Sequence, residues 1–158
     1  MWLYDQQVMD LSAKITADLT AAMKARDAVT TATLRSVLAA IKNLRVAEGH
    51  AGEVTDEETT ELVAREAKKR REAIDAYRDA GRPELVEREE QELAVLTRYL
   101  PEQLGDEDIR ALVDDAVTQA GAAAPGDFGK VMSVLMPKVK GRADGKVVAA
   151  LVRQRLGG

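Results

Sequence analysis

Near its C-terminus the chain reads Gly129-Lys-Val-Met-Ser-Val-Leu-Met-Pro-Lys-Val-Lys-Gly-Arg-Ala-Asp-Gly-Lys146, a short basic turn between two helical patterns. Before the turn, apolar residues recur at helical spacing over about 127–135. Pro137 disfavours helical geometry at the residue before it, so we expect this helix to end near Leu135. After the turn, Asp144 is a suitable N-cap for a last helix.

Helical spacing also accounts for the rest of the chain, and no stretch alternates as a strand does. Thr55 and Glu58 match a capping box, and Pro83 suits the first turn of a helix that Pro101 ends. The sequence therefore predicts an all-α protein with long helices packed as a bundle of hairpins. The expected parts are a four-helix N-terminal domain, a linker and a small three-helix domain with a basic tail, at residues 1–100, 101–105 and 106–158.

The residue composition excludes several kinds of site. The chain has no cysteine and a single histidine, His50, so disulfides, thiolate sites and a histidine-based zinc site are ruled out. His50 lies in a Gly-containing stretch that we interpret as a solvated loop. We expect no metal and no cofactor. No secretory signal or membrane-spanning stretch is visible, which predicts a cytoplasmic protein.

Charge is unevenly distributed along the chain. The formal net charge is −4, which argues against general nucleic-acid binding by the whole molecule. Residues 126–158, in contrast, carry seven Lys and Arg against two Asp, a formal charge of +5. The basic turn therefore lies in the electropositive part of an acidic protein.

The turn has the composition of a phosphate site. The amides at the start of the last helix favour an anion, arginine can grip a phosphate with two N–H groups, and lysines act as point charges. An ordinary hydrated turn between helices is the alternative interpretation. The residues expected to bind phosphate are Lys130, Lys138, Lys140, Arg142 and Lys146, and those expected to shape the loop are Gly129, Pro137, Gly141, Asp144 and Gly145.

A second basic run, Lys68-Lys-Arg-Arg71, has acids four residues away on either side. Such balanced charges are typical of a solvated helix face. The alternative is a secondary phosphate contact by Arg65, Lys68 and Lys69. The sequence contains no phosphate-binding glycine loop, and nothing favours a catalytic triad or an acid–base pair. We therefore expect no catalytic residues, although the question of enzymatic activity stays open.

Several motifs together resemble the YqeY-like proteins of the GatB/YqeY family. They are the Asp79-Ala-Gly-Arg82 turn, Leu96-Thr-Arg-Tyr-Leu-Pro-Glu-Gln-Leu104 and the Gly129–Gly145 stretch. The resemblance implies an all-helical protein in two parts. It also implies kinship with the C-terminal helical and tail region of the B subunit of tRNA-dependent amidotransferase, which engages tRNA. Similar modules are fused to a glutaminyl-tRNA synthetase.

Three functions follow as hypotheses. The first is a non-catalytic tRNA-binding accessory module. The second is a protein-interaction module, in which the charged hairpin of the third and fourth helices docks an aminoacyl-tRNA synthetase or an amidotransferase subunit. The third is an amidotransferase-like activity, a carbon–nitrogen ligase with glutamine as amido-N-donor. The third is the least favoured, because the resemblance places that chemistry in other subunits and domains.

Overall fold

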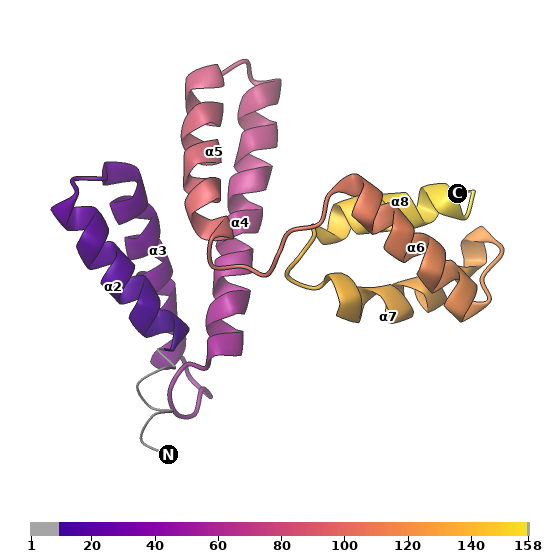
Figure 1. Ribbon diagram of the computed structural model, residues 1–158, viewed down its shortest axis with the longest axis horizontal. Helices are drawn as coiled ribbons and strands as arrows, with labels where there is room; N and C mark the ends of the chain where they lie inside the picture. Colours follow the sequence, from indigo (N-terminus) through magenta and orange to yellow (C-terminus); the bar gives the residue numbers. More distant parts are fainter. Residues whose placement is uncertain (1–9, 158) are drawn as a thin grey trace. The chain divides into compact units, whose positions relative to one another are not determined.

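The computed structural model describes residues 10–157, and the regular structure of these residues is entirely helical, with no strand (Figure 1). The all-α prediction is confirmed. The chain forms two compact units, residues 1–100 and 101–158. The segment 101–105, expected as a linker, belongs to the second unit. Each unit has a hydrophobic core of its own.

The first unit consists of two helical hairpins. Its described helices are α2 (Leu11–Lys24), α3 (Ala28–Arg45), α4 (Asp56–Asp79) and α5 (Pro83–Thr97). The predicted capping box is confirmed, since Thr55 Oγ1 accepts from the Glu58 amide and Glu58 Oε1 accepts from the Thr55 amide, both at 3.1 Å. The helix α5 ends three residues before Leu100, earlier than Pro101 alone predicts.

The core of this unit draws on only part of the α4–α5 hairpin. Val63 and Ala67 come from the first half of α4, and Val95 and Leu96 from the last turn of α5. These side chains pack on Ile15, Leu34, Val37 and Ile41 of α2 and α3. The far half of the hairpin extends beyond α2 and α3 and is held by packing of α4 on α5 (Figure 1).

A half-buried ion cluster joins α4 to α5. Arg70 Nε lies 3.0 Å from Glu92 Oε2 and 3.7 Å from Glu89 Oε2, and Arg70 Nη1 lies 3.7 Å from Glu66 Oε1. The Glu66–Arg70 pair is one of those expected at i, i+4. The interpretation of this run as wholly solvated is wrong at Arg70, because the carboxylates on α5 draw its side chain into the hairpin seam.

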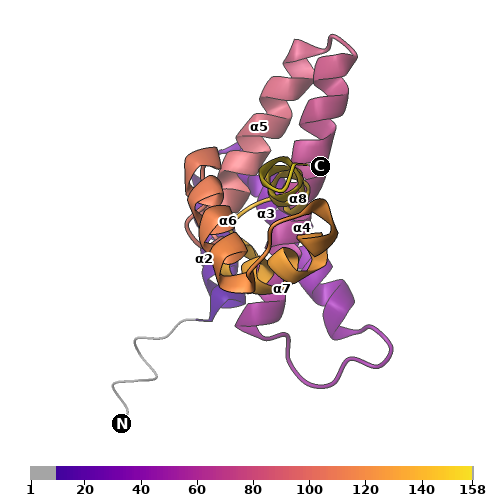
Figure 2. The same cartoon turned by 90° about the vertical axis from the view of Figure 1, so that its right-hand side faces the viewer.

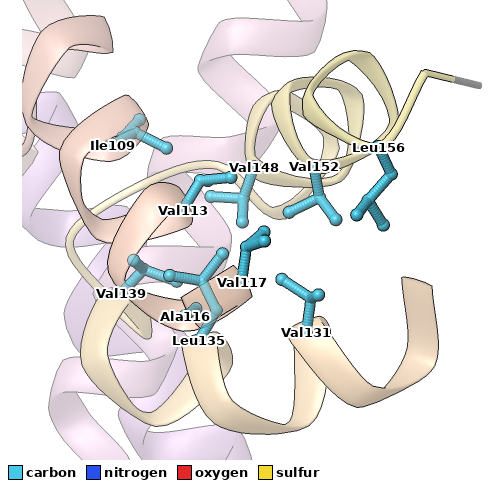
Figure 3. Packing of buried hydrophobic residues seen from close by; sticks show 10 residues of the cluster. All are labelled: Ile109, Val113, Ala116, Val117, Val131, Leu135, Val139, Val148, Val152 and Leu156. Atoms are coloured by element: carbon cyan, nitrogen blue, oxygen red, sulfur yellow. The ribbon is translucent and has the colours of Figure 1, made fainter. Parts of the chain in front are cut away.

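The second unit packs three helices around one core. They are α6 (Asp106–Ala120), α7 (Phe128–Val139) and α8 (Gly145–Arg155), with a 3₁₀ turn at Pro125–Asp127 (Figure 2). Gly121 ends α6 in the left-handed region, with φ at 64°. Figure 3 shows the fully buried Val131, Leu135 and Val139 of α7 facing α6 and α8.

The predicted end of α7 is wrong. The helix continues through Pro137 to Val139, four residues past Leu135. Proline removes the N–H that would donate to the carbonyl of Ser133, so the last turn of α7 forms at a local cost. Val139 is fully buried, and its burial in the shared core favours the extra turn over the local restriction at Met136.

Candidate nucleic-acid interface

The turn between α7 and α8 is tight and internally hydrogen-bonded. The Arg142 amide donates to Val139 O at 2.8 Å, and the Lys140 amide donates to Met136 O at 2.9 Å. Gly141 has φ at 76°, where a side chain is strained, so glycine is required there. Asp144 Oδ1 accepts from the Lys146 amide at 3.0 Å, which confirms Asp144 as the N-cap of α8.

Residues 101–104 clamp this turn. The Leu104 amide donates to Arg142 O at 2.8 Å, and Gln103 Nε2 donates to Gly141 O at 2.9 Å. In the other direction, Arg142 Nε donates a hydrogen bond to Glu102 O at 3.2 Å. The Pro-Glu-Gln-Leu motif thus holds the basic turn in one conformation. Both motifs, residues 101–104 and the basic turn, are recognisable in the sequence. Nothing in the sequence indicates that they form hydrogen bonds with each other across some 40 residues.

Arg142 has a structural role in this arrangement. Besides the bond to Glu102, its Nη1 donates to Lys138 O at 3.3 Å, near the C-terminal end of α7. The side chain is half-buried, and two of the five N–H groups of a guanidinium are used on main-chain carbonyls. The prediction that Arg142 grips a phosphate therefore rests on the remaining donors.

The lysines divide into two groups. Lys138, Lys140 and Lys146 are exposed at or beside the turn, and Lys138 Nζ donates to Gln119 Oε1 at 3.2 Å. Lys130 lies in the first turn of α7, with Nζ 3.7 Å from Asp127 Oδ1. A helix rises 1.5 Å per residue, so Lys130 is roughly 12 Å along α7 from Lys138. The structure therefore does not bring Lys130 into the turn.

Two motif glycines are not required by the fold. A Cβ added to Gly129 or Gly145 meets nothing within 4 Å, and neither residue has a positive φ. Gly129 lies in the first turn of α7 and Pro137 within its last turn, so neither shapes the loop as predicted. Gly145 is the first residue of α8, where the missing side chain leaves the backbone open to an approaching group.

The family model described as Yqey-like protein matches residues 12–156. This chain belongs to the YqeY family.

Two curated relatives of this YqeY chain carry the same name, "Altered inheritance of mitochondria protein 41, mitochondrial". The one from Pyrenophora tritici-repentis (strain Pt-1C-BFP) is 29% identical over 147 residues, covering 91% of this chain and 80% of the relative. The one from Lachancea thermotolerans (strain ATCC 56472 / CBS 6340 / NRRL Y-8284) is 26% identical over 156 residues, covering 94% and 83%.

The secondary basic patch of this YqeY chain lies on α4. Arg65, Lys68 and Lys69 are all exposed, and Lys69 Nζ pairs with Glu66 Oε2 at 2.8 Å. The patch belongs to the first unit and the turn to the second. Because they belong to different units, each is tested by itself.

His50 differs from its predicted state. Its side chain is only 11% exposed, and Nε2 lies 2.8 Å from Glu58 Oε2. The pKa of Glu58 lies below its usual range. The main cause is the hydrogen bond from the Thr55 amide, and the second is the hydrogen bond with His50. The interpretation as a solvated loop histidine is wrong because the capping glutamate also binds the imidazole. Within residues 10–157 no group of three His, Cys, Asp or Glu could hold a metal ion.

Across the described part of this YqeY chain, no helix has both the length and the apolar character needed to cross a bilayer.

Proposed function

We propose that this YqeY chain is a non-catalytic module that binds tRNA through the turn between α7 and α8. One observation carries the proposal. Lys138, Lys140 and Lys146 are exposed around the start of α8, on a turn that residues 101–104 hold in one conformation. Fixed cations bind a phosphate backbone without the entropic cost of ordering a loop.

The chemistry of the turn supports a phosphate group as the ligand. Amides at a helix N-terminus favour anions, and Gly145 leaves room for one to approach. The Asp144 carboxylate bonds to the Lys146 amide, so the lysine ammonium groups would supply most of the attraction. The choice of tRNA as the phosphate bearer rests on the family resemblance to the amidotransferase B-subunit tail.

The shifted acids give no support to a catalytic role. Backbone amides of Ala123 and Ala124 hold the pKa of Asp127 below its usual range, and the Thr30 hydroxyl does so for Asp27. Both carboxylates therefore serve as local caps. We propose no reaction for this chain, and release of ammonia from glutamine by the purified protein would contradict that position.

The test measures tRNA affinity by fluorescence anisotropy across a salt series. Affinity should fall with salt, with a logarithmic slope of about −0.7 to −0.9 for each phosphate contact. The triple variant Lys138→Glu, Lys140→Glu, Lys146→Glu should bind at least about tenfold more weakly. Its slope of log affinity against log salt concentration should be smaller in magnitude by about 2 to 3. A matched triple, Lys24→Glu, Lys42→Glu, Arg110→Glu, changes the net charge equally at exposed positions elsewhere.

Two outcomes would overturn the proposal. No binding of wild-type protein at low salt removes the tRNA function. Equal weakening by the two triple variants removes the turn as its site, because the effect would then follow net charge alone. Replacing Arg65, Lys68 and Lys69 in a further variant tests the α4 patch separately.

A second function has one observation in its favour. The far half of the α4–α5 hairpin carries a pocket of about 280 Å³ lined by Arg78, Gly81, Arg82, Pro83, Val86, Glu87 and Glu90. This end of the hairpin would dock a synthetase or an amidotransferase subunit. Pull-downs after nuclease treatment separate the functions: a partner lost with Val86→Glu supports docking, whereas a partner lost with nuclease supports RNA binding.

The cytoplasmic location is part of the proposal. The names of the two relatives place those proteins in mitochondria. Imaging of a tagged full-length protein in its own cells decides between the two compartments.

A further inference from the structure

A second pocket lies in the first unit, and none of the basic residues assigned to phosphate lines it. It opens between α2, the start of α3 and the residues just after α5, with a volume of about 360 Å³. Small-molecule sites commonly have this size. Its wall is lined by Lys14, Asp18, Ala21, Ala22, Ala25, Asp27, Thr30, Arg98 and Tyr99.

Hydrogen bonds join three polar groups of the pocket wall. Tyr99 Oη donates to Asp18 Oδ2 at 2.6 Å, and Lys14 Nζ donates to the same oxygen at 3.0 Å. Lys14 Nζ also lies 5.6 Å from the centre of the Tyr99 ring. Burial, followed by the Asp18 hydrogen bond, raises the pKa of Tyr99 far above its usual range, so the phenol stays protonated. Asp18 Oδ1 takes no part in these bonds.

A second carboxylate lies near the start of α3. Asp27 caps this helix by accepting from the Thr30 amide at 3.1 Å and from Thr30 Oγ1 at 2.7 Å. Those bonds hold the pKa of Asp27 below its usual range, so it is charged at neutral pH. The pKa of Asp18 is lowered as well, first by the hydrogen bond from Tyr99, so both carboxylates of the pocket are charged at neutral pH.

Arg98 supplies the opposite charge. It is exposed and follows the last residue of α5. Its charge contributes to the lowered pKa values of both Asp18 and Asp27. Among residues 10–157, however, its guanidinium forms no hydrogen bond or ion pair. A guanidinium with donors left over, in a pocket wall that also holds two carboxylates, is suited to a ligand that carries both charges.

We propose that this pocket binds a small zwitterion of the α-amino acid class, with its carboxylate on Arg98 and its ammonium group toward Asp18 and Asp27. The four charged residues of the wall cancel to a formal charge of zero, which matches a net-neutral ligand. Two carboxylates disfavour a phosphate or another multiply charged anion. The wall of Ala21, Ala22 and Ala25 leaves an apolar surface for a small side chain.

The test titrates the full-length protein with free alanine and follows backbone amide signals by NMR. Saturable shifts confined to residues such as Ala21, Ala25 and Tyr99 are expected, with an affinity in the millimolar range. Alaninamide lacks the carboxylate and lactate lacks the ammonium group, so each should bind at least about tenfold more weakly. Glycine and serine extend the series to other small side chains.

Arg98→Gln should abolish the saturable shifts, and Arg110→Gln, another exposed arginine, should leave them unchanged. Lactate or alaninamide binding as well as alanine overturns the proposal, and so does an Arg98→Gln variant that binds as wild type. No saturable shift with alanine, glycine or serine overturns it as well. The analogue series uses wild-type protein, so it decides the question even if the variant fails to fold. None of these outcomes depends on tRNA binding.

Discussion

Arg142 has a structural role that does not depend on a ligand. Its guanidinium bonds to Glu102 O and Lys138 O, and it thereby ties the end of α7 to the segment before α6. Lysine carries the same charge but cannot make two such bonds with a planar fork. Geometry at this position therefore matters separately from charge.

The first prediction follows from that distinction. Arg142→Lys should destabilise the second unit by about 1 to 3 kcal/mol, the usual effect of losing bonds to a charged donor. The tRNA affinity of this variant should fall together with its stability, because the turn that carries the lysines is no longer held in one conformation. Denaturant unfolding followed by circular dichroism measures the first effect and anisotropy the second. A variant indistinguishable from wild type would mean that charge alone matters at residue 142.

Glu89 is a residue whose charge opposes the fold. Burial raises its pKa first, and repulsion from Glu92 raises it further, while Arg70 partly offsets both. The pKa of Glu89 is higher in the folded than in the unfolded state, so the protonated carboxyl group favours folding. This contribution to stability is complete below the unfolded-state pKa. That contribution is lost as pH rises through the folded pKa.

The second prediction tests this sign. Glu89→Gln should be more stable than wild type at pH 7, by less than about 1 kcal/mol, and the difference should shrink toward pH 4. Thermal unfolding at the two pH values measures it. Glu87→Gln, an exposed neighbour on the same helix, is the matched control. A loss of stability at pH 7 would show that the 3.7 Å contact with Arg70 outweighs burial.

At the scale of helices, apolar spacing predicted each described α-helix, because long helices with one buried face carry a strong periodic pattern. Two features could not be predicted in this way. The burial of Val139 carries α7 past Pro137, and Arg70 bonds to glutamates 19 and 22 residues away. Both are tertiary effects, which a local pattern does not contain.

The third prediction concerns the first residue of α8. Gly145→Ala adds a methyl group in open space, so folding stability should stay equal or rise by about 0.4 to 1 kcal/mol. If phosphate rests on this backbone, tRNA affinity should fall about tenfold while stability does not. Unfolding and anisotropy on the same variant separate the two. Gly126→Ala, equally open, should have the same small effect on stability and leave tRNA affinity unchanged, and unchanged binding by Gly145→Ala would exclude the backbone contact.

At the scale of the whole molecule, each unit buries its own apolar residues. Val131, Leu135 and Val152 are fully buried within the second unit, and the clamp on the basic turn also lies within residues 101–158. The candidate site was identified from its motif and charge. Its rigidity was not, because it arises from bonds between segments some 40 residues apart.

The fourth prediction is that a fragment of residues 101–158 folds alone and keeps salt-dependent tRNA binding. A core of its own and a complete clamp are the physical reasons. Circular dichroism shows its folding, and anisotropy compares its affinity with that of the full chain. A folded fragment that fails to bind would assign a necessary contact to residues 1–100, with the α4 patch as the first residues to replace.

The same residues that clamp the turn also connect it to the rest of the chain, since only Pro101 and Glu102 separate Leu100 from Gln103. Mechanical tension on this connection would therefore act directly on the bonds from Gln103 and Leu104 to the turn. In a pulling experiment from the N-terminus, these bonds would carry load before the helices of the second unit separate. The basic turn would then be the first part of that unit to lose its shape.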